Sequence, residues 1–193
     1  MAETAANGGL RRHVPNLLTA TRIAVIPPLV AAFYLPDPWR AWLPLALFVF
    51  ASVTDWFDGL LARRWQAGSK LGQFMDPIAD KLLVVAVILM LAADGRLEGV
   101  HVIPAIAILC REMFVSGLRE FLAFRGAEMP VSNLAKWKTA TQMAALTILL
   151  LPAPEAGAPG LVLFWISAAL AVQTGWAYVG AARPHFREEE DTP

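Results

Sequence analysis

Cysteine and histidine are scarce in this chain of 193 residues, which has one cysteine, Cys110, and three histidines. A single cysteine excludes an intrachain disulfide and a thiolate cluster for zinc, so we expect Cys110 to be a small buried apolar residue. The histidines, His13, His101 and His185, lack the spacing of metal ligands, and we expect none of them to be catalytic. Neither a glycine-rich phosphate loop nor a Ser/His/Asp arrangement is present in the sequence.

Charged residues are also few, at 17% of the chain, whereas 57% of the residues are hydrophobic and the formal net charge is zero. The apolar residues form long blocks, and about 20 apolar residues suffice for a helix to cross a bilayer. This pattern excludes an ordinary soluble domain and predicts an all-α, polytopic membrane protein with a short N-terminal juxtamembrane segment. We expect one membrane domain over 14–182, between tails at 1–13 and 183–193. The six predicted transmembrane helices lie near 17–35, 41–62, 74–93, 100–124, 134–152 and 158–182.

Lysine and arginine are distributed unevenly around these segments. If the amino terminus is cytoplasmic, only Arg40 and Arg96 of the sixteen lysines and arginines fall on the far side. Positively charged loops stay in the cytoplasm, so this bias predicts a multi-pass protein of the cytoplasmic (inner) membrane with both termini inside the cell. Trp39 and Trp42 flank the end of a predicted span, as interfacial aromatic residues do.

Four aspartates stand at helical spacing within this apolar background. Asp55 and Asp58 are three residues apart and Asp76 and Asp80 are four apart, so each pair shares one helix face. Polar, turn-forming residues at 68–70 separate the pairs, and the two acidic faces can therefore meet. Converging carboxylates repel one another unless cations neutralise them, and oxygen ligands suit magnesium, manganese or calcium rather than zinc. A magnesium-type site also commonly uses substrate phosphates as ligands.

Small and basic residues accompany the aspartates. Gly59 and Ala62 lie on the face of Asp55 and leave room for a ligand near the helix backbone, and Arg63 can pair with a phosphate. The complete pattern from Asp55, which includes Gly72, is Asp-x2-Asp-Gly-x2-Ala-Arg-x8-Gly-x3-Asp-x3-Asp. It resembles the signature of the CDP-alcohol phosphatidyltransferases, integral membrane enzymes that make phospholipids.

A polar stripe opens the first span. Asn16, Thr19 and Arg22 recur every third residue after Pro15, which suits the start of a helix. Spacing alone leaves two interpretations open, a capped juxtamembrane turn with snorkelling side chains or the border of a site. In the branch of the family that uses glycerol phosphate, the first helix looks like Pro-Asn-x-x-Thr-x-x-Arg and borders the active site. The resemblance therefore favours the second interpretation.

The fourth span contains a run of charged residues. Arg111 and Arg119 lie eight residues apart, near one helix face. Glu112, Ser116 and Glu120 form a second stripe. A buried arginine needs an anion, so we expect one arginine to pair with a glutamate and the other to bind an anionic acceptor. The run Arg-Glu-x3-Ser-x2-Arg-Glu resembles the same branch of the family.

Two lysines, Lys136 and Lys138, open the fifth span, and with Thr139 and Gln142 they also resemble that branch. Residues two apart cannot face the same way on a helix. At most one lysine should therefore enter the pocket, and the other should meet lipid headgroups.

The resemblance implies a homodimeric enzyme that transfers the phosphatidyl group of CDP-diacylglycerol to glycerol 3-phosphate, with its site facing the cytoplasm. It implies two Mg²⁺ or Mn²⁺ ions held by Asp55, Asp58 and Asp76, with Asp80 sharing one ion and acting as general base. Binding of CDP-diacylglycerol is assigned to Asp58, Gly59, Ala62, Arg63, Gly72, Asn16 and Thr19. Binding of the acceptor is assigned to Arg111, Arg119, Ser116, Lys136, Lys138 and Arg22. Membrane lipids surround the chain, and no nucleic-acid partner is expected.

Two alternatives remain open. A cardiolipin synthase, whose acceptor is phosphatidylglycerol, shares the aspartate motif. A protein of another class, a six-span cation transporter, could use the same carboxylates as an ion path. The transporter predicts metal flux without lipid turnover and leaves Gly59, Arg63 and Gly72 unexplained.

Overall fold

The computed structural model describes residues 19–65, 70–126 and 132–187. Within these ranges, the description excludes the side chains of residues 56, 58–65, 70–74, 76 and 183–187. The described chain is helical and contains no β-strand, which confirms the predicted all-α class. It divides into two compact units, Met1–Asp94 with Leu150–Pro152, and Gly95–Leu149 with Ala153–Pro193.

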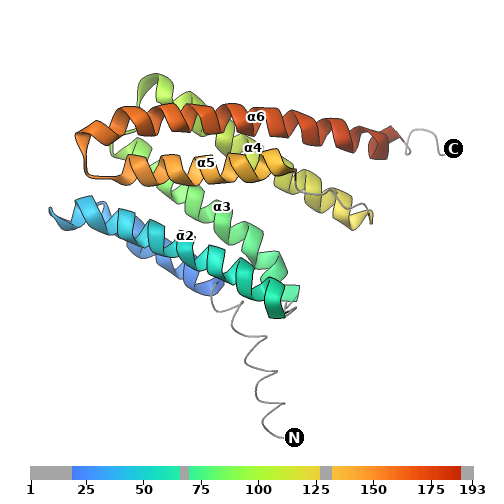
Figure 1. The fold of residues 1–193 in the computed structure, drawn as a ribbon, viewed down its shortest axis with the longest axis horizontal. Helices are drawn as coiled ribbons and strands as arrows, with labels where there is room; N and C mark the ends of the chain where they lie inside the picture. The colour runs from blue at the N-terminus through green and yellow to red at the C-terminus, as the bar shows by residue number, and fades with distance from the viewer. Residues whose placement is uncertain (1–18, 66–69, 127–131, 188–193) are drawn as a thin grey trace, which may run out of the picture. The chain divides into compact units, whose positions relative to one another are not determined.

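Three helices form the described part of the first unit: Thr19–Ala32, α2 (Trp39–Trp65) and α3 (Lys70–Ala93) (Figure 1). Each helix contributes fully buried apolar side chains, such as Leu29, Phe48 and Val87. Burying one such side chain stabilises the fold by roughly 1.5–3 kcal/mol. Each of the three helices therefore has a buried apolar face.

The second unit contains α4 (Val102–Phe124), α5 (Asn133–Leu150) and α6 (Gly157–Arg187). A 3-10 turn precedes α4 and another precedes α6. α4 packs along α6 (Figure 1). Val115, Ala135 and Tyr178, one from each helix, form a buried cluster. The three helices of this unit thus contribute to one shared buried cluster.

The junction between α5 and α6 is tightly packed. A Cβ atom at Gly160 would lie 2.9 Å from the Leu149 side chain, so glycine lets the two helices approach closely. Arg96 Nη1 donates a hydrogen bond of 2.9 Å to the backbone oxygen of Leu149. This bond caps one of the carbonyl groups that the end of α5 leaves without a partner inside the helix.

Two segments within the described residues, Gly99–Phe124 and Pro154–Ala182, are long and apolar enough to cross a membrane. Only 22% and 28% of their apolar windows are buried, whereas the core helix of a soluble protein is mostly buried. Side chains such as Ile106, Phe114 and Trp176 are exposed. Large exposed apolar surfaces are unfavourable in water, so the molecule has the character of a membrane protein.

The helices lie where the apolar blocks predict them, with differences at their ends. α2 and α3 extend beyond the predicted segments 41–62 and 74–93 because the polar aspartate motif continues both helices. α6 runs to Arg187 and so enters the predicted tail. Hydropathy marks where an apolar surface ends, and a helix need not end there.

The expectation that Cys110 is buried is wrong, because its side chain is exposed on α4. Ile106 and Phe114, four residues before and after it, are also exposed, so Cys110 belongs to an outward-facing apolar stripe. The burial preference of cysteine comes from soluble proteins. A helix surrounded by lipid can carry apolar residues on its outer face.

Candidate active site

The aspartate motif lies in the two consecutive helices α2 and α3. Asp55 and Asp58 lie in α2, and Asp76 and Asp80 lie in α3. The side chains of Asp55 and Asp80 are described, and each is about half exposed. Of the predicted CDP-diacylglycerol ligands, Gly59, Ala62 and Arg63 lie in α2 and Gly72 in α3, whereas Asn16 lies outside the described residues.

A buried arginine joins the two acidic helices. Arg22, in the helix Thr19–Ala32, is only 1% exposed. Its Nη2 lies 2.6 Å from Asp55 Oδ1, and its Nη1 donates a hydrogen bond to Asp80 Oδ1. One guanidinium therefore holds a carboxylate from α2 and a carboxylate from α3 at the same place.

Thr19, one turn before Arg22, is also 1% exposed. The two described residues of the polar stripe, Thr19 and Arg22, are therefore both buried. A snorkelling arginine would place its charged group in water at the helix end. That interpretation is wrong for Arg22, whose guanidinium instead contacts two of the aspartates.

Oxygen ligands for a hard divalent ion come together at this point. The side chains of Asp55 and Asp80 are 49% and 51% exposed, so a ligand can reach both. Among the side chains that the structure describes, no three acidic, histidine or cysteine groups gather into a metal site. Asp58 and Asp76, the other two predicted ligands, are outside that set. Carboxylates from neighbouring helices are the donors that Mg²⁺ and Mn²⁺ prefer, so the chemistry of the donor set fits.

The second unit contains its own charged cluster, built by α4 and α5. Glu112 Oε1 accepts a hydrogen bond from Lys138 Nζ and a second, of 3.2 Å, from Arg111 Nη1. The side chains are 4% exposed for Lys138, 11% for Arg111 and 16% for Glu112. Two cations thus share one carboxylate in a mostly buried place, and these three side chains together carry one positive charge.

Helix α6 completes the surroundings of Arg111. The guanidinium carbon of Arg111 lies 5.7 Å from the centre of the Tyr178 ring, within the range of a cation–π contact. A Cβ atom at Gly175 would lie 3.4 Å from Arg111 Cγ, so the helix backbone passes close to the arginine stem. Sequence reasoning missed both residues, because one tyrosine and one glycine in an apolar helix carry no signal of a charged neighbour.

The other predicted acceptor residues differ in exposure. Arg119 and Lys136 are exposed, and Ser116 is half-buried. The two lysines of α5 point differently, with Lys138 buried and Lys136 at the surface, as their spacing predicts. Arg119 has no ion-pair partner among the residues described. Arg111 is therefore the arginine that pairs with a glutamate among the described residues.

A buried amide accompanies Lys138 on α5. Gln142 stands four residues further along the same face and is 2% exposed. Its Oε1 is buried and finds no hydrogen-bond partner within the part of the chain described here. A buried acceptor in that state needs a ligand or a water molecule to satisfy it.

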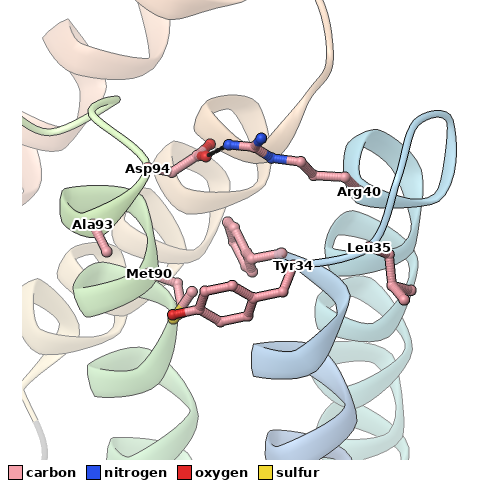
Figure 2. Close-up of a pocket in the computed structure, with 7 residues that line it drawn as sticks. Tyr34, Leu35, Arg40, Met90, Ala93 and Asp94 are labelled. Carbon is pink, nitrogen blue, oxygen red and sulfur yellow. Dashed lines mark hydrogen bonds and ion pairs between the residues drawn. The ribbon is translucent and has the colours of Figure 1, made fainter.

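A pocket of about 280 Å³ lies elsewhere in the first unit (Figure 2). It is lined by Phe33, Tyr34, Leu35, Arg40, Met90, Ala93 and Asp94. Arg40 donates a hydrogen bond to Asp94, which together with their mutual attraction raises the pKa of Arg40 above its ordinary value. Asp94 directly follows the end of α3 and lies fourteen residues beyond Asp80, roughly 20 Å along the chain at helical rise. The pocket is thus remote from the aspartate motif.

A family model described as CDP-alcohol phosphatidyltransferase matches residues 12–173, which include the whole aspartate motif and both charged clusters. The chain belongs to this family. Membership argues against the cation transporter, since the motif is then that of a lipid-synthesising enzyme rather than an ion path.

Several relatives match across most of the chain. A Rickettsia felis protein named CDP-diacylglycerol--glycerol-3-phosphate 3-phosphatidyltransferase is 44% identical over 180 residues, covering 91% of this chain and 98% of that protein. A Cereibacter sphaeroides protein of the same name is 37% identical over 217 residues, covering 92% and 98%. A rice (Oryza sativa) protein named cardiolipin synthase (CMP-forming) is 41% identical over 194 residues, covering 90% of this chain and 57% of that protein.

Proposed function

We propose that this protein transfers the phosphatidyl group of CDP-diacylglycerol to glycerol 3-phosphate, giving phosphatidylglycerol phosphate and CMP. The observation that carries the proposal is the 44% identity to the Rickettsia felis enzyme of that name over 91% of the chain. The complete aspartate motif and the basic cluster on α4 and α5 support it. Both are what a metal-dependent transfer to an anionic acceptor requires.

The reaction is a displacement at phosphorus. The primary hydroxyl oxygen of the acceptor attacks the phosphorus that carries diacylglycerol, and the bond from this phosphorus to the CMP oxygen breaks. The hydroxyl proton passes to Asp80, whose half-exposed carboxylate is open to an incoming substrate. Asp55, Asp58 and Asp76 would hold two divalent ions, Mg²⁺ or Mn²⁺, with Asp80 sharing one, and their positive charge would offset the charge that develops on CMP.

Small residues around the motif would seat the nucleotide. Gly59, Ala62 and Gly72 would leave space beside α2 and α3, and Arg63 would supply a guanidinium for a phosphate. Asn16 and Thr19, of the polar stripe seen in the sequence, would border the same substrate. Thr19 lies one helix turn before Arg22, whose guanidinium contacts Asp55, and this supports the role.

The acceptor phosphate would be held by the basic residues of α4 and α5. Arg119 is the stronger candidate of the two arginines, because Arg111 is already paired with Glu112. Lys138 adds a buried positive charge, and the Gln142 amide adds a hydrogen-bonding group on the same face. Ser116 and Lys136 complete the predicted set on these two helices, and the exposed Lys136 would equally meet lipid headgroups. Arg22, also predicted from the sequence to bind the acceptor, is left out of this proposal because it is 1% exposed and its guanidinium contacts Asp55 and Asp80.

The six helices would each span the cytoplasmic membrane, with both termini and the active site on the cytoplasmic side. Two segments have the length and apolarity for spanning, and the excess of lysine and arginine on one side supports the orientation. CDP-diacylglycerol would enter from the surrounding lipid. A homodimer is proposed by family resemblance.

Purified protein with CDP-diacylglycerol, Mg²⁺ or Mn²⁺ and radiolabelled glycerol 3-phosphate tests the proposal. We expect labelled phosphatidylglycerol phosphate, no product in excess chelator, and no product from Asp55→Asn. The same assay with phosphatidylglycerol as acceptor addresses the second candidate, which the 41% identity to the rice cardiolipin synthase favours. Cardiolipin formation without phosphatidylglycerol phosphate would replace the first activity by the second.

A further inference from the structure

Arg22 is the largest fully buried side chain among those described, and it lies in an otherwise apolar helix. Its guanidinium contacts Asp55 and Asp80, whose carboxylates are half exposed. The positive charge therefore lies beneath the two carboxylates, on the side away from the surrounding medium. A buried arginine in this position is costly unless anions compensate it.

The same two carboxylates are predicted ligands of a divalent ion. With no metal present, clustered carboxylates repel one another, and a cation must offset that repulsion. Arg22 supplies such a cation from within the protein. When a divalent ion binds, the guanidinium and the ion are like charges a few ångströms apart and oppose each other.

We propose that Arg22 is a built-in counter-cation of the metal-binding carboxylates, which holds Asp55 and Asp80 together in the metal-free protein and weakens the binding of divalent ions. This inference rests on the proposed function in one respect, namely that Asp55 and Asp80 are metal ligands. Arg22 is then a positioning residue that sets the metal affinity. The sign of its effect separates this role from a merely structural one.

Loss of the charge at position 22 has two opposite consequences. The metal-free protein loses the cation between its carboxylates and becomes less stable. The metal-bound protein loses a repulsion, so its affinity for the ion rises by a factor of about ten or more, as expected for like charges in a partly buried site. A purely structural arginine would act differently, because its loss would disorder the ligands and lower the affinity.

Another arginine provides a matched control. Arg40 also belongs to the first unit and also pairs with an aspartate, Asp94 (Figure 2). Asp94 directly follows α3, roughly 20 Å along that helix from Asp80. Arg40→Gln removes the same charge and breaks another arginine–aspartate pair, in which the arginine is the half-exposed partner, without touching the carboxylates of the motif.

The experiment measures Mn²⁺ binding to the full-length protein in detergent, by the electron paramagnetic resonance of free Mn²⁺, and thermal unfolding in EDTA and in Mn²⁺. We expect Arg22→Gln to unfold at a lower temperature in EDTA, to bind Mn²⁺ about tenfold or more tightly than wild type, and to gain more stability from Mn²⁺. Arg22→Lys keeps the charge and should bind Mn²⁺ within about threefold of wild type. Arg40→Gln should leave the affinity unchanged.

Equal or weaker Mn²⁺ binding by Arg22→Gln, with normal binding by wild type, would overturn the role of Arg22 and leave the proposed reaction intact. Absence of Mn²⁺ binding by wild type would instead overturn the metal site, and this inference with it. Nitrogen-15 arginine labelling of wild type tests the contact without relying on a variant that folds. Mg²⁺ should shift the Arg22 side-chain signals and not those of Arg40, and unchanged Arg22 signals would refute the proposal.

Discussion

Replacing Glu112 by glutamine should strongly destabilise the protein, because two buried cations depend on this one carboxylate. Glu112→Gln keeps the shape and one acceptor oxygen and removes only the charge. The side chains of Arg111 and Lys138, which are 11% and 4% exposed, would then lie close together with no carboxylate between them.

The magnitude follows from the geometry. At the 3.2 Å separation of Arg111 Nη1 and Glu112 Oε1, unit charges attract by about 5 kcal/mol if the effective dielectric constant is about 20. Desolvation offsets part of this attraction, and removing one partner of a buried pair typically costs about 3–5 kcal/mol. Glu112 retains 16% exposure, so we expect the lower end, about 3 kcal/mol.

Denaturant unfolding in detergent micelles, followed by helical circular dichroism, measures this loss. Lys136→Met is the matched control, because Lys136 is exposed on α5, the helix that carries Lys138, and its loss should change the stability by less than about 0.5 kcal/mol. If Glu112→Gln unfolds at the same denaturant concentration as Lys136→Met, the cluster does not carry the buried charges described here.

Four further substitutions test the site and the packing around it. Asp80→Asn should abolish turnover while CDP-diacylglycerol still binds, as expected for a base; loss of nucleotide binding as well would remove that role. Arg119→Lys should raise the KM for glycerol 3-phosphate far more than the KM for CDP-diacylglycerol, whereas Arg111→Lys should mainly lower stability; equal effects on both KM values would move the acceptor phosphate elsewhere. Arg96→Gln should cost about 1–2 kcal/mol in unfolding experiments because a charged donor to the end of α5 is lost, and an unchanged stability would contradict that capping role.

The positions of the helices follow from sequence because they depend on local properties. Runs of apolar residues predict each helix, and helical periodicity predicts that Lys136 and Lys138 point differently. The run of charged residues in α4 also predicts that one of its arginines pairs with a glutamate. It cannot tell which arginine does so, because Arg111 and Arg119 have similar local surroundings in the sequence.

The partners of the buried charges depend on contacts between distant segments. Arg22 meets Asp55 and Asp80, which are 33 and 58 residues away in sequence, and no local pattern sets that distance. The sequence did contain a signal for this contact, because an arginine on a polar stripe that is buried must meet an anion. Tyr178 offered no comparable signal, because its contact with Arg111 depends on how α6 packs against α4.

Buried ion pairs are weak arguments for stability, because apolar residues of similar size often replace them without loss. The pairs in this protein therefore need another explanation, and Lys138→Met provides the test. Methionine matches the length of the lysine stem, and Glu112 keeps its pair with Arg111, so no charge is stranded. We expect unfolding within about 1 kcal/mol of wild type, in contrast to Glu112→Gln. If Lys138 helps to hold the acceptor phosphate, the same variant should lose most of its activity, with a raised KM for glycerol 3-phosphate. A variant as active as wild type would show that Lys138 is not kept for the acceptor. A variant as unstable as Glu112→Gln would show that Lys138 is kept for the fold.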